Sequence, residues 1–233
     1  MIITEQCRRC GGLDCFCSHS SSCWHLRRSL LLTREKLTPS DSRPLTNFVI
    51  ATVGLAGVGK STVTNLLTQQ LCVEPIYFGG QVVQLLERNN VEVTEGSERQ
   101  LRESLRAEYG PGAIAVLSMA EIRHSLDEHR IALIDGLYSP EELNVLEEQT
   151  DSEIYLIAIH SHRYLREARM VKRPLRPLDP TELRSRDDRE VGFLGKAIPI
   201  TLADFHVVNN TTIAHLEEQI SPILKRWLGW SNP

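Results

Sequence analysis

The sequence lacks any long run of apolar residues. A membrane-spanning helix needs about 20 of them in succession, whereas apolar stretches such as residues 131–134 and 154–159 have only the length of a strand. The apolar burst nearest the N-terminus, residues 30–32, is also shorter than the roughly 7 to 15 residues of a secretory signal core. These absences predict a soluble protein without a membrane partner and argue against secretion.

A large excess of charge of either sign is also missing. Lys and Arg number 26 against 30 Asp and Glu, which gives a net charge of -4 and a pI near 6.1. A generic nucleic-acid-binding domain is strongly basic, so that class is disfavoured. The 233 residues are 41% apolar and 24% charged, a globular composition that excludes a collagen, a disordered chain and a coiled coil.

Cysteine is almost absent beyond residue 46. Five of the six cysteines lie in residues 1–46, and only Cys72 follows them. Residues 1–46 also hold seven Lys/Arg and four Asp/Glu, for a charge of +3, whereas the remainder carries -7. Two prolines with Asp and Ser at 39–44 are typical of a linker. We therefore predict a leader over residues 1–46 and one domain over 47–233.

The leader admits several interpretations. Its cysteines and histidines could ligate zinc, but only four residues separate the two cysteine pairs, far fewer than in a usual zinc ribbon. Its Arg- and Ser-rich composition also fits an organellar transit peptide. We favour a disordered tail, including upstream sequence translated from an early start codon, and so expect a cytoplasmic protein with organellar targeting as the alternative. The potential ligands are Cys7, Cys10, Cys15, Cys17, His19, Cys23 and His25.

The strongest motif lies at residues 54–61, directly after an apolar run. Residues 48–53 are rich in β-branched side chains and predict a buried parallel strand. The octapeptide GLAGVGKS then satisfies the phosphate-binding pattern G-x-x-x-x-G-K-[ST]. Glycines let a phosphate approach the backbone N–H groups, and the next helix directs its positive end at the anion. The predicted nucleotide-binding residues are Gly54, Gly57, Val58, Gly59, Lys60, Ser61 and Thr62.

ATP and Mg²⁺ are the cofactors that this motif predicts. Lys60 would reach the β- and γ-phosphates, and the hydroxyl of Ser61 would bind Mg²⁺. Residues 61–71 carry apolar side chains at helical spacing, as expected for a helix that docks on the sheet. A second apolar strand, 131–134, ends at Asp135, whose carboxylate would hold Mg²⁺ opposite Ser61.

Strand-like and helix-like segments alternate along the rest of the domain. This alternation predicts an α/β fold, a three-layer α/β/α sandwich around a parallel sheet, with ligands beyond the carboxyl ends of the strands. The further strands expected are 154–159 and 205–208, and the further helices are 82–88, 98–108, 113–126, 140–148 and 213–228.

Basic residues crowd the segment between residues 163 and 189. Nine Lys or Arg lie there, interrupted by three prolines. Cations that close over a nucleotide stabilise charge during phosphoryl transfer, so we predict a mobile lid over about 161–196 in which Arg169 and Arg173 bind the transferred group. Such a patch could also follow a nucleic-acid backbone. Five acidic residues between 179 and 190 dilute its charge, so nucleic acid is the less favoured partner.

Five segments in order resemble a known family. From about residue 49 to 220 the chain is similar to adenylate-kinase-like P-loop proteins of the dephospho-CoA kinase-like and nucleoside monophosphate kinase-like groups. The resemblance implies a nucleoside monophosphate kinase type of fold with core, acceptor-binding and lid parts, Mg-ATP as donor and a small-molecule acceptor. It also implies that Asn209 and Asn210 lie near the adenine. The segments are GLAGVGKST (54–62), LRESLRAEYGPGAIA (101–115), IDGLYSPEEL (134–143), RSRDDREVGFLGKAI (184–198) and ADFHVVNNTT (203–212).

The acceptor side departs from the family pattern. Where a Gly-Asp-x-x-Arg-like stretch is usual, the chain has Gln81 and Gln84, and Tyr138 replaces the usual arginine after the Asp-Gly turn. A hydroxyl acceptor, as in dephospho-CoA kinase, would need an acidic general base near Gln81, whereas an anionic phosphate needs none. Substitute ligands for an acceptor phosphate are Arg99, Arg102 and Arg106, each of which could equally belong to the helix surface.

The sequence thus predicts a Mg-ATP-dependent kinase of nucleoside monophosphate type. Its predicted catalytic residues are Lys60, Asp135, Arg169 and Arg173, and its acceptor would be a nucleotide-like phosphate. Two alternatives stay open: a dephospho-CoA kinase-like enzyme, and an ATP-binding or ATP-hydrolysing regulatory switch whose acceptor site has decayed. The identity of the acceptor and the oligomeric state are not encoded in any motif.

Overall fold

The computed structural model describes residues 47–174 and 177–228. The predicted leader, with its zinc and targeting hypotheses, lies outside the described residues, as do lid residues 175–176 and the C-terminal residues 229–233. Among the helices that are described, none is long and apolar enough to cross a membrane.

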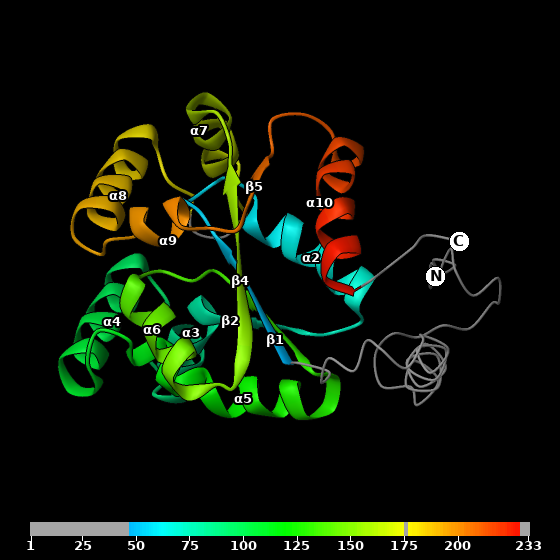
Figure 1. The fold of residues 1–233 in the computed structure, drawn as a ribbon. Helices are drawn as coiled ribbons and strands as arrows, with labels where there is room; N and C mark the ends of the chain where they lie inside the picture. The colour runs from blue at the N-terminus through cyan, green and yellow to red at the C-terminus, as the bar shows by residue number, and fades with distance from the viewer. Residues whose placement is uncertain (1–46, 175–176, 229–233) are drawn as a thin grey trace, which may run out of the picture. The chain divides into compact units, whose positions relative to one another are not determined.

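One parallel sheet organises the described residues (Figure 1). β1 is central, with β3 on one side and β4 on the other, so the strand order reverses at β1. Ligands of open α/β sheets bind at such a switch point, beyond the carboxyl ends of the strands. The strands, in sheet order, are β2 (Pro75–Tyr77), β3 (Ile131–Asp135), β1 (Asn47–Val53), β4 (Ser152–His160) and β5 (Phe205–Val208).

Helices cover both faces of this sheet (Figure 1). Two helices share one apolar cluster with the sheet, and four share the cluster on the opposite face, where one of the four also packs on two of the others. The predicted three-layer α/β/α sandwich is therefore confirmed. The first face carries α2 (Lys60–Leu71) and α10 (Ile213–Leu228), and the second carries α3 (Phe78–Arg88), α5 (Ala113–His129) and α6 (Pro140–Gln149), with α4 (Glu95–Tyr109) packed on α3 and α5.

The central strand shows why the sequence adopts this arrangement. Successive side chains of a strand point to opposite faces, and Val49 and Ala51 join one apolar cluster whereas Ile50 joins the other. All three are buried, so both faces of β1 need apolar side chains. The near-continuous apolar run of the sequence follows from this double burial.

Three helices occupy the carboxyl end of the sheet, in and after the segment predicted as a lid. Asp179 starts the second of them by accepting the N–H groups of Thr181 and Glu182. Ala56 of the P-loop packs into a small apolar cluster with Met170 and other residues of this segment. The helices are α7 (Arg163–Val171), α8 (Pro180–Gly192) and α9 (Ala197–Thr201).

The structure extends two elements beyond their predicted limits. The helix predicted over 82–88 begins at Phe78, whose ring is fully buried. The helix predicted over 98–108 begins at Glu95, after Thr94, which accepts the N–H of Ser97 as its N-cap. Glycines and short polar residues weaken the helical pattern at both starts, so the periodicity of the sequence missed these turns.

Candidate active site

The loop over residues 54–59 carries β1 into α2 through two sharp turns. Gly57 and Gly59 have φ angles of 79° and 92°, in the left-handed region that favours glycine. A Cβ on Gly59 would collide with the side-chain amide of Asn209, and one on Gly54 would lie 2.6 Å from the carbonyl oxygen of Ile159. The glycines of the motif are therefore required by the close packing of this loop.

The ammonium of Lys60 folds back over the loop. Its Nζ donates to the carbonyl oxygens of Gly54 and Leu55 at 2.9 and 3.1 Å. Burial, together with the positive charge of Lys196, lowers the pKa of Lys60 to about 7, although Glu190 and Asp135 oppose this shift. An anion arriving at this point would favour the charged ammonium again.

Ser61 and Asp135 meet at the carboxyl ends of β1 and β3. Ser61 Oγ donates to Asp135 Oδ2 at 3.0 Å, and Thr52 Oγ1 donates to the other carboxylate oxygen at 3.3 Å. Thr52 Oγ1 also accepts the N–H of Gly136 at 3.2 Å. The register of the sheet places Thr52 opposite Asp135, so the backbone itself fixes this carboxylate beside the P-loop.

The oxygens of Ser61 and Asp135 fit a magnesium ion. Two Mg²⁺ ligands at about 2.1 Å in neighbouring positions of an octahedron lie about 3 Å apart, the separation seen between these two oxygens. Within the described part of the chain, no cluster of three or more His, Cys, Asp or Glu side chains could hold a metal by itself. Mg²⁺ suits such a sparse site because it takes its other ligands from phosphates and water.

Two arginines of α7 donate hydrogen bonds to the P-loop. Arg166 Nε donates to the carbonyl oxygen of Ala56 at 2.7 Å, and its Nη2 contacts Asp187 Oδ1 of α8 at 2.6 Å. Arg169 Nη1 donates to the carbonyl oxygen of Gly57 at 3.3 Å and its Nη2 to that of Asn209 at 2.9 Å. Both guanidinium groups therefore hold the loop in shape.

The loop after β5 also reaches the P-loop. Asn209 Nδ2 donates to the carbonyl oxygen of Val58 at 2.9 Å. Asn210 Oδ1 accepts from Ser161 Oγ at 3.1 Å and from the N–H of His162 at 2.8 Å. The two asparagines tie β5 to the segment that follows β4, beside the glycine turn.

An ion cluster lies next to Lys60. Lys196 Nζ donates to Glu190 Oε2 at 2.8 Å, and Arg186 Nε donates to the other oxygen of that carboxylate at 2.8 Å. The same ammonium lies 4.0 Å from the ring centroid of Tyr138, whose hydroxyl accepts from Arg186 Nη2 at 3.5 Å. Although burial raises it, these cations hold the pKa of Glu190 well below its usual range.

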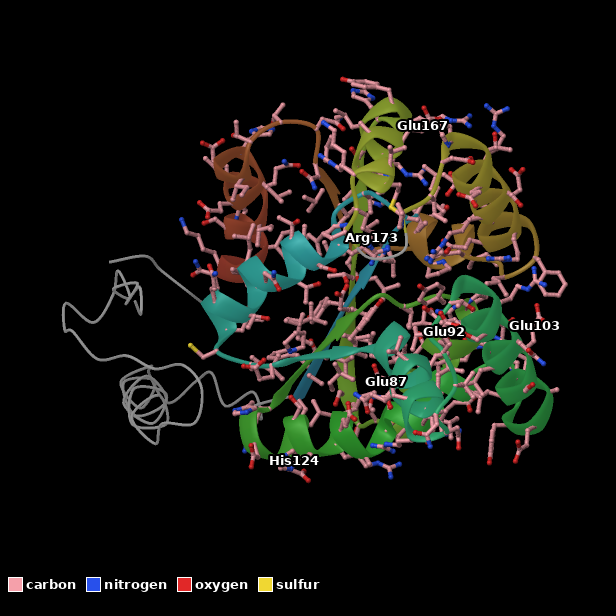
Figure 2. The ribbon with its side chains drawn as sticks, turned by 180° about the vertical axis from the view of Figure 1, so that it is seen from behind. Glu87, Glu92, Glu103, His124, Glu167 and Arg173 are labelled. Atoms are coloured by element: carbon pink, nitrogen blue, oxygen red, sulfur yellow. The ribbon has the colours of Figure 1, made fainter. Side chains whose placement is uncertain are left out.

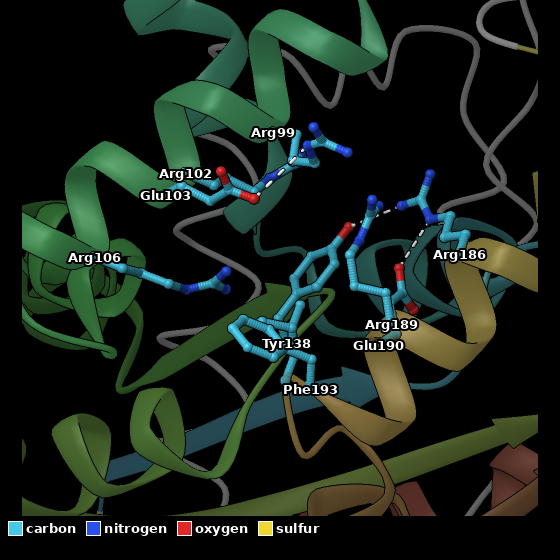
Figure 3. A pocket seen from close by; sticks show the side chains of 10 residues that line it. Arg99, Arg102, Glu103, Arg106, Tyr138, Arg186, Arg189, Glu190 and Phe193 are labelled. Atoms are coloured by element: carbon cyan, nitrogen blue, oxygen red, sulfur yellow. Dashed lines mark hydrogen bonds and ion pairs between the residues drawn. The ribbon is translucent and has the colours of Figure 1, made fainter.

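A pocket lined by five arginines adjoins this cluster (Figure 3). Its cavity volume is about 40 Å³, and the empty space of about 450 Å³ around it includes open solvent. Figure 3 shows arginines of α4 on one side, α8 on the other and the ring of Tyr138 between them. Because only two carboxylates line it, the pocket favours an anion. Its lining is Arg99, Arg102, Glu103, Arg106, Tyr138, Arg186, Arg189, Glu190, Phe193 and Leu194.

The arginines of α4 differ in how firmly they are held. Arg102 Nη2 pairs with buried Glu98 and its guanidinium lies 5.8 Å from the ring centroid of Tyr138. Arg99 pairs with Glu103 at 3.7 Å on the exposed surface, where such pairs contribute little. Arg106 Nη2 lies 3.8 Å from Glu142 Oε1, and within the described residues neither atom has a hydrogen-bond partner.

Glu142 forms the buried floor behind Tyr138. Its Oε2 accepts the N–H of Tyr138 at 2.7 Å. Burial raises the pKa of Glu142 to about 7, against the attraction of Arg106 and Lys196. At neutral pH this carboxyl is therefore partly protonated and neutralises only part of the positive charge of the pocket.

Gly136 joins the P-loop to the arginine pocket. A Cβ built on it would lie 3.8 Å from Lys60 Cε and 4.0 Å from Tyr138 Cε2. The turn after β3 therefore borders both the lysine of the P-loop and the central ring of the pocket.

The predicted site residues fall into two groups. Ser61, Lys60 and Asp135 come together, and the arginines predicted for the acceptor line one pocket. Arg173 lies in the segment after α7, where its N–H donates to the carbonyl oxygen of Met170 at 3.3 Å (Figure 2). Gln81 donates to Glu121 of α5 at 3.1 Å.

Sequence reasoning missed the half of the pocket formed by α8. Arg186 and Glu190 are four residues apart, a spacing that is typical of an ordinary ion pair on the surface of a helix. Lys196 and Phe193 carry no motif of their own. The sequence singled out Tyr138 only as a departure from a pattern, whereas the structure places it at the centre of the cations.

The chain was compared with family models, with curated proteins and with solved structures. No family model matches it. The crystal structure of TT1252 from Thermus thermophilus shares its fold, with a TM-score of 0.52 and 17% identity over 78% of this chain and 98% of that chain. A shikimate kinase from Bacteroides thetaiotaomicron aligns with a TM-score of 0.49 and 16% identity over 78% of this chain and 99% of its own.

A curated relative shows the family. The UPF0200 protein of Hyperthermus butylicus is 31% identical over 185 residues, which span 78% of this chain and 95% of the relative. These comparisons do not show the predicted resemblance to adenylate kinase-like or dephospho-CoA kinase-like proteins. The chain, an α/β protein with a P-loop motif, belongs to the UPF0200 family.

Proposed function

We propose that the protein is a Mg-ATP-dependent phosphotransferase of nucleoside monophosphate kinase type, which moves the γ-phosphate of ATP to a nucleotide-like phosphate in the arginine pocket. The observation that carries this proposal is the meeting of Lys60 and Tyr138 at Gly136. A phosphate-binding lysine and an anion pocket that share one boundary can hold a donor and an acceptor end to end.

The P-loop side supplies the donor half of the reaction. Lys60 and the backbone N–H groups of Gly57 and Gly59 would hold the β- and γ-phosphates, which displace the carbonyl contacts of Lys60. Mg²⁺ bound by Ser61 and Asp135 would offset the charge that develops on the phosphate oxygens. Arg169 would position the P-loop through its bonds to carbonyl oxygens, and Asn209 would lie at the nucleotide.

The arginine pocket supplies the acceptor half. A guanidinium group can donate two parallel hydrogen bonds to a phosphate, and Arg99, Arg102 and Arg106 of α4 all line the pocket. Phe193 stands on the rim with 81% of its surface exposed. An exposed aromatic ring beside arginines suits a planar base stacked next to a phosphate. These features favour a nucleotide over a simple sugar.

The charges of the pocket favour a phosphate acceptor over a hydroxyl. A hydroxyl must lose a proton to a general base as it attacks. Glu190 is a weak base because its pKa is held well below the usual range, and Gln81 offers no acid. A phosphate oxygen attacks without losing a proton, forming a bond to the γ-phosphorus as the bond to the bridging oxygen breaks and ADP leaves. This argument disfavours the dephospho-CoA kinase alternative.

Acceptor-dependent turnover tests the proposal. The purified full chain is incubated with Mg-ATP and a panel of nucleoside monophosphates and dephospho-CoA, and ADP formation is measured. We expect one nucleoside monophosphate to raise ADP formation well above the rate of ATP hydrolysis, and Lys60→Ala to abolish it. Tight ATP binding with the same low hydrolysis for every acceptor would contradict the kinase and support the regulatory switch.

A further inference from the structure

Side chains of other elements hold the carbonyl groups of the P-loop. Three successive carbonyl oxygens of the loop each accept a hydrogen bond in this way. The pairs are Arg166 with Ala56 at 2.7 Å, Arg169 with Gly57 at 3.3 Å and Asn209 with Val58 at 2.9 Å. The carbonyl of Ala56 shares its peptide group with the N–H of Gly57, which the proposed function assigns to a phosphate. One peptide group would thus be bound at one end by Arg166 and at the other by the donor.

Arg166 extends this contact to α8. Its Nη2 donates to Asp187 Oδ1 at 2.6 Å, and 7% of the Arg166 side chain and 19% of the Asp187 side chain are exposed. Arg186 and Arg189, which lie beside and near Asp187 on this helix, line the arginine pocket. A single guanidinium therefore joins a peptide group of the P-loop to a helix that carries part of the proposed acceptor site.

Apolar packing supports the same connection. The side chain of Ala56 packs in one cluster with Met170 of α7 and Leu183 of α8. Leu183 is buried and precedes Asp187 by one helical turn, so both residues lie on the same face of α8. A Cβ on Gly57 would also lie 3.0 Å from the carbonyl oxygen of Arg166. Close packing of this kind transmits small displacements, so α8 should respond to changes in the P-loop backbone.

The geometry of the Arg166 guanidinium suits a role in positioning. A buried ion pair contributes little net stability, because desolvation offsets most of the attraction between its charges. The rigid fork of the guanidinium instead fixes the directions of the groups that it binds. A phosphate that accepts the N–H of Gly57 polarises the peptide group and makes the carbonyl of Ala56 a stronger acceptor. Binding of the donor should thus strengthen the bond from Arg166.

We propose that Arg166 is a positioning residue that transmits the binding of donor phosphates from the P-loop to α8 through Asp187. Once the phosphates bind, Arg166 and Asp187 hold α8 in one arrangement, in which its arginines face the acceptor. This inference rests on the proposed function and adds to it a link by which the donor prepares the arginine pocket. Because such coupling is reciprocal, a bound acceptor also tightens the binding of the donor by the same factor.

Two variants break this link at α8. Asp187→Ala removes the carboxylate and leaves Arg166 able to bind the carbonyl oxygen of Ala56. Since this variant leaves a buried cation without that carboxylate, it is expected to destabilise the fold. The double variant Arg166→Met/Asp187→Leu removes both charges and should recover stability. Asp188→Ala changes the next aspartate of α8, which is exposed, and is the matched control.

Hydrogen exchange of the backbone amides in the full chain, with and without Mg-ADP, is the readout. In every protein, Mg-ADP should protect α2, which begins at Lys60 of the P-loop. In the wild type and in Asp188→Ala, it should also slow the exchange of α8 by about tenfold. In both variants that break the link, the slowing of α8 should fall to about twofold or less while α2 stays protected.

A purely structural ion pair gives a different result. It would make the exchange of α8 faster in the variants to the same extent with and without Mg-ADP. The tenfold slowing would then persist in the double variant, which overturns the inference. Protection of α2 without any response of α8 in the wild type would overturn it as well.

The same measurements distinguish the inference from the function on which it rests. If Mg-ADP protects neither helix of the wild type, nucleotide binding at the P-loop is contradicted, and the proposed function falls together with the inference. If α8 responds through Asp187 but no acceptor in the panel raises turnover, the proposed kinase activity fails while the link between the P-loop and α8 stands.

Discussion

The donor side and the acceptor side of the site are built in different ways. On the proposed donor side, the P-loop is one short segment whose backbone and Lys60 would bind the phosphates, completed by Ser61 and Asp135 at the ends of β1 and β3. The arginine pocket draws its side chains from α4, the turn after β3 and α8, which are far apart in the sequence. A site made of backbone leaves a contiguous motif, whereas a site made of side chains on separate helices does not.

The two sides also differ in how their charges are held. Asp135 sits between two hydroxyl groups, Ser61 and Thr52, and faces no arginine in the contacts described above. The acceptor side instead shares its carboxylates among several cations, as Glu190 does for Lys196 and Arg186. Changes on the donor side should therefore affect every reaction of ATP, while changes on the acceptor side should affect the acceptor alone.

Lys60→Met should produce the largest effect. Loss of the ammonium that binds the β- and γ-phosphates is expected to lower the turnover number by about 10³-fold, with any acceptor and with water alike. Stopped-flow or coupled measurement of ADP formation checks this expectation. Lys225→Met, which changes an exposed lysine of α10, is the control. If the loss appeared with one acceptor only, the separation between a donor and an acceptor side would be wrong.

Glu142→Gln tests the buried acid behind the pocket. The folded chain binds a proton at Glu142 up to a pKa of about 7, against 4.5 for an ordinary carboxyl. Its contribution to stability is thus complete below about pH 4.5 and is lost as the pH rises through 7, by roughly 3 kcal/mol. The variant should remove this loss.

Urea unfolding at pH 5.0 and pH 7.5 measures the effect of Glu142→Gln. Between the two pH values, the wild type should lose more stability than the variant, because only the wild type has a carboxyl that ionises there. Arg106 and Lys196 face position 142 in the wild type and in the variant alike. Asp135→Asn, on the donor side, should leave that difference close to the wild-type value. Equal pH dependence in wild type and Glu142→Gln would show that Glu142 is ionised throughout.

Arg102→Met should raise the acceptor KM by about 10- to 100-fold while the dissociation constant of ATP stays unchanged. Because buried Glu98 would lose its ion pair with Arg102, the change is made together with Glu98→Gln. Steady-state kinetics with varied acceptor checks the result. Arg123→Met, which changes an exposed arginine of α5, is the control. If the KM of ATP rose as much as the KM of the acceptor, separate donor and acceptor sides would be contradicted.

Phe193→Ala should have the smallest effect. Its ring is exposed, so its removal should leave the free energy of unfolding nearly unchanged. Loss of one stacking contact is expected to raise the KM of a nucleotide acceptor by about tenfold and to leave a phosphate without a base unaffected. The comparison of two acceptors in the same variant decides whether this rim recognises a base.

The sequence predicted the elements that carry their own pattern. The double burial of β1 and the helical spacing of α2 fixed the P-loop between them, and Asp135 at the end of β3 followed from the same logic. The arginines of α4 could be predicted as acceptor ligands only through a resemblance, because the sequence of that helix does not indicate which elements pack opposite it. The positions of Arg186 and Lys196 opposite them are set by the packing of α8 and of the turn at Gly195, and no local sequence pattern predicts that packing.

A compound that joins two nucleosides through a polyphosphate chain tests the meeting of the two sides directly. If the P-loop and the arginine pocket share a boundary at Gly136, this compound fills both, and its calorimetric dissociation constant should be at least tenfold lower than that of ATP. The gain should vanish in Arg102→Met/Glu98→Gln while ATP binding persists. An affinity equal to that of ATP in the wild type would contradict a shared donor and acceptor site.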